Sequence, residues 1–111
     1  MRKDPKIFLL HILESIEKIE EFTKGITKKE FFKSIKTQDA VIRRLEIIGE
    51  ATKNLPKEFT QKHPEVPWGE LARMRDKLIH GYFGVDLNLT FKIIKEDLPD
   101  LKKKILKVKR K

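Results

Sequence analysis

Apolar residues recur every three or four positions along most of the chain, and this spacing constrains the fold more than any other feature. One series begins with Ile7, Leu10 and Leu13, and another begins with Val41 and Leu45. Side chains at this spacing lie on one face of an α-helix, whereas the two-residue alternation of a half-buried strand does not occur in the sequence. The sequence therefore predicts an all-α fold.

Start and stop signals divide this pattern into about four to five helices of a single domain, residues 1–111, in which residues 102–111 form a basic helix end or tail. The length of 111 residues suits one compact domain. Pro56, Pro64 and Pro67 bracket a linker in which a helix does not easily continue. The first expected helix runs from Pro5, capped by Asp4, to Gly25, and a short one follows from a Thr27–Glu30 capping box through Ile35. A long helix covers residues 38–54, and another runs from Trp68, a core anchor, to His80. The last helical region consists of two segments, residues 87–96 and 99–108, with Asp97 as a cap between them.

Charge and composition limit the classes of partner and of chemistry. Lys and Arg number 26 against 17 Asp and Glu, and the resulting formal net charge of +9 favours a polyanionic partner. Because cysteine is absent, disulfides, thiolate metal sites and a cysteine nucleophile are excluded. His11 and His63 have no companions at the spacing of metal ligands, so we expect neither a metal nor another cofactor. No apolar run approaches the ~18 residues that span a membrane, and we expect a cytoplasmic protein.

The long helix carries an apolar arc over more than half of its circumference, which is typical of a central or dimer-forming helix. Arg44 projects into this arc, where its charge needs a partner or must reach the helix edge. Glu46 and Glu50 share the polar face. They can orient an arginine, tune a histidine or bind a partner; the alternative is a solvated face in salt bridges with Arg43 and Lys53.

The segment from residue 74 to residue 83 holds the candidate catalytic groups. Arg75 falls inside the apolar stripe of its helix, a departure that marks either a functional site or a structural ion pair. His80 lies five residues later, roughly 140° around the axis, so the two side chains would not converge on one continuous helix. Either the helix ends at His80, as Gly81 suggests, or a second subunit supplies its own residues across a cleft.

Arginine and histidine together suffice to cleave RNA without a metal. An imidazole can take the 2′-hydroxyl proton or protonate the leaving 5′-oxygen, while a guanidinium holds the phosphate. The alternative for His80 is a helix cap or a core group. Asp76 can hold His80 of the same or another subunit, or pair with Lys77 or Arg73. Tyr82 follows the break, where its ring can pack while its hydroxyl stays in solvent.

The run Arg75-x-x-x-x-His80-x-Tyr82 resembles the Arg-x(4–6)-His motif of the HEPN superfamily, in the form typical of its HepT-like branch. Further segments of the chain support the resemblance in the right order, and together they cover nearly the whole chain. They are residues 40–51 (AVIRRLEIIGEA), Pro67-Trp68, residues 82–86 (YFGVD) and residues 97–101 (DLPDL).

This resemblance implies a homodimeric HEPN-like helical bundle in which two motif helices line a basic cleft. It implies a metal-independent endoribonuclease acting on tRNA or mRNA, with Arg75 and His80 as the catalytic pair. It also implies the toxin of a type VII-like HEPN/MNT toxin–antitoxin module. In such pairs an MNT-type nucleotidyltransferase antitoxin transfers AMP to the motif tyrosine, here Tyr82, which adds bulk and negative charge that repel RNA. The alternatives are a non-catalytic nucleotide- or RNA-binding module for such a nucleotidyltransferase, and a purely structural dimerisation partner.

Overall fold

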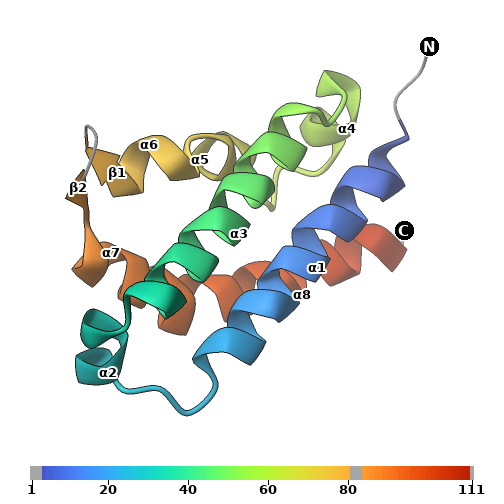
Figure 1. The fold of residues 1–111 in the computed structure, drawn as a ribbon. Coiled ribbons are helices and arrows are strands. Elements are labelled where there is room, and N and C mark those ends of the chain that lie inside the picture. Colours follow the sequence, from blue (N-terminus) through green and yellow to red (C-terminus); the bar gives the residue numbers. More distant parts are fainter. Residues whose placement is uncertain (1–3, 81–83, 111) are drawn as a thin grey trace.

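Two long helices, α1 (Pro5–Thr23) and α3 (Ile35–Lys53), lie side by side and antiparallel in the computed structural model (Figure 1). A third, α8 (Leu98–Arg110), packs against α1, and Lys102 Nζ donates to Glu20 Oε1 at 2.9 Å between them. The structure describes residues 4–80 and 84–110, except for the side chain of His80. The predicted all-α class is confirmed. The three helices supply most of the core, including Leu9, Ile12, Ile16, Ile19, Val41, Leu45, Ile48, Leu101, Ile105 and Val108.

The first two helices begin at the predicted caps. Asp4 Oδ1 accepts a hydrogen bond from the backbone N–H of Lys6 at 3.0 Å. Before α2 (Lys28–Lys33), Thr27 Oγ1 accepts from the N–H of Glu30 at 3.1 Å, and Glu30 Oε1 accepts from the N–H of Thr27 at 3.0 Å. The backbone N–H of Thr27, and after it the Thr27 hydroxyl, lower the pKa of the Glu30 carboxyl. The capping box is therefore confirmed.

The boundary between α2 and α3 differs from the prediction. The helix α2 ends at Lys33 rather than continuing through Ile35, and α3 begins three residues before residue 38. The reason is Ser34, whose Oγ accepts from the backbone N–H of Thr37 at 3.2 Å and caps α3. Ile35 is 71% exposed, so it belongs to neither helix's buried face.

The segment expected to be a linker contains a short helix, α4 (Lys57–Lys62). Pro56 occupies its N-cap, where the missing N–H costs no helical hydrogen bond. After α4, Trp68 is buried and its Nε1 donates to the carbonyl of His63 at 2.8 Å. This contact confirms Trp68 as a core anchor.

Residues 87–110 form one continuous helical region rather than two segments separated by a cap. It consists of α7 (Leu87–Lys92), the π-helical η1 (Ile93–Asp97) and α8. The prediction of Asp97 as a cap is wrong. In a regular helix Pro99 would clash with the carbonyl four residues earlier. A wider turn, in which the N–H of Leu98 donates to the carbonyl of Ile93 five residues back, accommodates it.

The helix expected from Trp68 to His80 is divided into α5 (Trp68–Ala72) and α6 (Met74–Leu78). Both pack against α3, where a glycine allows a close approach. A Cβ built on Gly49 would lie 3.3 Å from the carbonyl oxygen of Leu71. The described residues therefore hold more and shorter helical segments than expected, and none of these helices combines the length and apolar composition needed to cross a membrane.

Replacing Gly49 with valine should destabilise the protein, because the added isopropyl group would press on the backbone of α5. We expect a loss of about 1–3 kcal/mol in the free energy of unfolding, the usual cost of overpacking. The midpoint of thermal denaturation, followed by circular dichroism, measures it. Gly69→Ala is the control: an added Cβ would meet only the flexible Arg73 side chain at 3.5 Å, so stability should not fall. Equal midpoints for Gly49→Val and wild type would contradict this account.

Candidate functional site

The motif helix α6 ends two residues before His80. Ile79 adopts an extended conformation with φ −107° and ψ 119°. Ile79 and His80 form β1 (Ile79–His80), which pairs antiparallel with β2 (Gly84–Val85). The end of the helix, the first of the two arrangements considered from the sequence, is therefore present in a single chain. The angle of roughly 140° between Arg75 and His80 on a continuous helix no longer applies.

Arg75 does not lie inside the apolar stripe, contrary to the prediction. Its side chain is 59% exposed, whereas Met74 and Leu78 are buried. The difference follows from the early end of the helix, because Ile79 leaves α6 and the buried face narrows to Met74 and Leu78. Arg75 is about 100° from Met74 on the helix, at the edge of that face.

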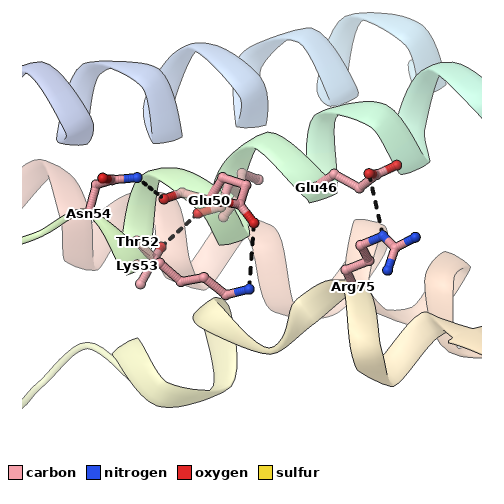
Figure 2. A network of polar contacts seen from close by, with 7 residues as sticks. Glu46, Glu50, Thr52, Lys53, Asn54 and Arg75 are labelled. Carbon is pink, nitrogen blue, oxygen red and sulfur yellow. Dashed lines mark hydrogen bonds and ion pairs between the residues drawn. The ribbon is translucent and has the colours of Figure 1, made fainter.

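Glu46 of α3 faces this exposed arginine. Figure 2 shows Glu46 Oε2 and Arg75 Nε forming an ion pair across the two helices, at a distance of 3.5 Å. The side chain of Glu46 is 31% exposed, so it is partly shielded from solvent. Among the residues that the structure describes, no other ion pair joins α3 to α6. The two glutamates of α3 thus differ, since Glu50 pairs with the exposed Lys53 at 3.5 Å on its own helix.

Two other predicted site residues, Asp76 and Arg44, take no part in the ion pair between Glu46 and Arg75. Asp76 is exposed, and no described lysine or arginine nitrogen lies within 4.0 Å of its carboxylate, so the pairing with Lys77 or Arg73 is wrong. Lys77 instead pairs with Glu70 at 3.9 Å. A contact between Asp76 and His80, and the surroundings of Tyr82, lie outside the described residues. Arg44 is half-buried on α3.

A cavity of about 390 Å³ lies on the other face of α6, between α5–α6 and η1–α8. Carboxylates outnumber ammonium groups on its walls. Lys77 and Lys104 are paired there with Glu70 and Asp100. An excess of negative charge disfavours a phosphate backbone, so a polyanion is better accommodated at the Arg75 edge of α6 than in this cavity. The charged residues lining it are Glu70, Glu96, Asp97, Asp100, Lys77 and Lys104.

Gly49 supports the site but was not singled out from the sequence. It allows the close approach of α5 to α3 one helical turn after Glu46. A signal was available, because a glycine inside a helix costs about 1 kcal/mol relative to alanine and implies a packing reason. No group of three or more His, Asp or Glu residues able to hold a metal ion occurs within residues 4–80 and 84–110, the side chain of His80 excepted.

The family model and the relatives that match this chain are all described as ribonucleases. The family model described as "Ribonuclease HepT-like" matches residues 12–108. A protein of Thermococcus cleftensis, provisionally named ribonuclease HepT, is 56% identical over 110 residues, covering 99% of this chain and 100% of that protein. A provisionally named RNase of Caldanaerobacter subterraneus is 48% identical over 106 residues, covering 96% of this chain and 95% of the relative.

A longer relative contains a similar segment. A Methanocaldococcus jannaschii protein is 63% identical over 108 residues, which are 97% of this chain. Its name combines γ-glutamylcyclotransferase with a provisional RNase assignment, and the chain spans about half of its length, 49%. No solved structure matches the chain significantly.

Proposed function

The chain belongs to the HepT-like ribonuclease family, and on that basis we propose that it is the endoribonuclease toxin of a type VII-like HEPN/MNT toxin–antitoxin module. The substrate is tRNA or mRNA, the reaction needs no metal, and the protein acts in the cytoplasm as a homodimer. One observation carries the proposal: Arg75 projects from the edge of α6 with an exposed side chain, just before the helix gives way to the strand holding His80.

The chemistry assigned to this pair is transesterification within the RNA. His80 removes the proton of a 2′-hydroxyl, and the 2′-oxygen attacks the adjacent phosphorus. The bond from phosphorus to the 5′-oxygen breaks, the 5′-oxygen takes up a proton, and a 2′,3′-cyclic phosphate remains. Arg75 binds the non-bridging oxygens and stabilises the charge that builds on them. Homodimerisation brings two motif helices to one basic cleft.

Neutralisation follows from the position of Tyr82 within the same motif. An MNT-type nucleotidyltransferase antitoxin transfers AMP from ATP to the tyrosine hydroxyl and releases pyrophosphate. The negative charge of the added phosphate repels the RNA backbone, and the bulk of the nucleoside fills the cleft.

Substitution of either catalytic residue should abolish cleavage. We expect wild-type protein to cut tRNA or mRNA in the presence of EDTA and to leave 2′,3′-cyclic phosphate ends. Arg75→Ala and His80→Ala should each reduce the rate by about 10²–10⁴-fold, the typical effect of losing general acid–base catalysis or a charge-stabilising group. Gel analysis and end-group chemistry of the fragments measure this.

Binding of the same RNAs provides the control. His80→Ala should retain affinity for RNA, because only the proton transfer is removed. If all three proteins are folded and bind RNA but none cleaves it, the non-catalytic binding module is the correct function. A wild-type activity that EDTA abolishes would contradict the metal-independent reaction.

Tyr82→Phe should block neutralisation while leaving the ribonuclease intact. With purified MNT-type nucleotidyltransferase from the same genome and labelled ATP, wild type should incorporate AMP and lose its activity. The phenylalanine variant lacks the acceptor oxygen, so label should fall to background and cleavage should continue. Equal labelling of both proteins would place the modification on another residue.

A further inference from the structure

The ion pair between α3 and α6 is made through one particular atom of the arginine. Nε of Arg75 approaches Glu46 Oε2 at 3.5 Å. In Figure 2 the dashed contact runs to Nε, and the two terminal nitrogens of the guanidinium take no part in it. A guanidinium presents two parallel N–H groups to a phosphate most effectively when its plane is fixed. A carboxylate beside Nε can restrict that plane and leave the terminal nitrogens available.

The helix that carries Glu46 is a firm support. Residues of α3 are buried against α1 on one side, and α5 and α6 pack on another. At Gly49, one turn beyond Glu46, an added Cβ would meet the carbonyl oxygens of Leu71 and Ala72 at 3.3 Å and 3.6 Å, so α5 crosses α3 at a point with no room for a larger side chain. Glu46 is thereby held relative to α6 by backbone packing and not by its own side-chain contacts alone.

We propose that Glu46 is a positioning residue for catalysis: it holds the exposed Arg75 side chain in the orientation that receives the scissile phosphate. This inference rests on the proposed ribonuclease function. Glu46 itself touches no reacting atom. A side chain as exposed as Arg75 would otherwise sample several rotamers, and small displacements of a catalytic group reduce turnover strongly.

The negative charge of Glu46 allows a positioning role to be distinguished from a purely electrostatic role by measuring RNA binding and kcat. A carboxylate next to a phosphate-binding arginine lowers the local positive potential, so its presence weakens RNA binding in general. If Glu46 acted only through its charge, removing it would tighten RNA binding and leave turnover unchanged or higher. If it positions Arg75, removing it lowers turnover even though binding is not weakened. The two roles therefore predict opposite results for kcat.

Glu46→Gln and Glu50→Gln form a matched pair of variants. Each removes one negative charge from α3, one helical turn apart, but Glu50 pairs with Lys53 and not with Arg75. We expect Glu46→Gln to lower kcat by about 10- to 100-fold with an equal or lower KM for RNA. Glu50→Gln should keep the wild-type kcat. Steady-state cleavage in EDTA over a range of RNA concentrations measures both parameters, and RNA titrations by fluorescence anisotropy measure the affinity separately.

A second measurement reports on the arginine without any reaction. The ¹⁵Nε relaxation of Arg75, with its signal assigned by loss in Arg75→Lys, should show greater mobility in Glu46→Gln than in wild type or Glu50→Gln. Equal kcat values for the two glutamine variants, or unchanged Arg75 mobility, would overturn the proposal. If wild type cleaves none of the RNAs, the ribonuclease function fails, and the relaxation data alone decide whether Glu46 orders Arg75.

Discussion

The packing of α3 on two sides is the constraint on which the rest of the structure depends. One face of this helix is buried against α1, and another receives α5 and α6. At Gly49 the backbone of α5 comes so close that a side chain larger than hydrogen would have to displace it. The helix α5 therefore packs closely on α3, and α6, which follows it, packs on α3 where Arg75 meets Glu46.

Charged side chains of opposite sign lie on different sides of α6. Arg75 lies at the α3 edge, while the carboxylates of the cavity lie between α6 and η1–α8. The π-helical turn ahead of Pro99 keeps α7, η1 and α8 continuous, so the acidic residues around residue 97 line that cavity instead of capping a new helix. A polyanion that approaches α6 is thus repelled less at the Arg75 edge than at the face that lines the cavity.

Sequence periodicity and capping signals were sufficient for the all-α class, for the caps at Asp4 and Thr27, and for the burial of Trp68. They were insufficient where a single residue changes the direction of the backbone. Ser34 caps α3, so this helix begins earlier than predicted. Ile79 is extended rather than helical, and Arg75 is exposed instead of buried. The sequence left two roles open for the glutamates of α3, and the three-dimensional structure separates them: Glu46 meets Arg75 across helices, whereas Glu50 meets Lys53 along its own. No local pattern could distinguish them, because both are polar-face residues one turn apart.

An exposed ion pair contributes little to stability, typically 0–1 kcal/mol, so the Glu46–Arg75 contact is not explained by folding. The interaction energy of the ion pair would rise when RNA covers the edge of α6, because exclusion of water strengthens electrostatic interactions between groups already in place. The carboxylate then opposes RNA binding, but a chain with a formal net charge of +9 can tolerate that loss of attraction. In the proposed ribonuclease, RNA binding and the orientation of the arginine would therefore depend on different residues: the general positive charge would attract the RNA, and the carboxylate of Glu46 would orient Arg75.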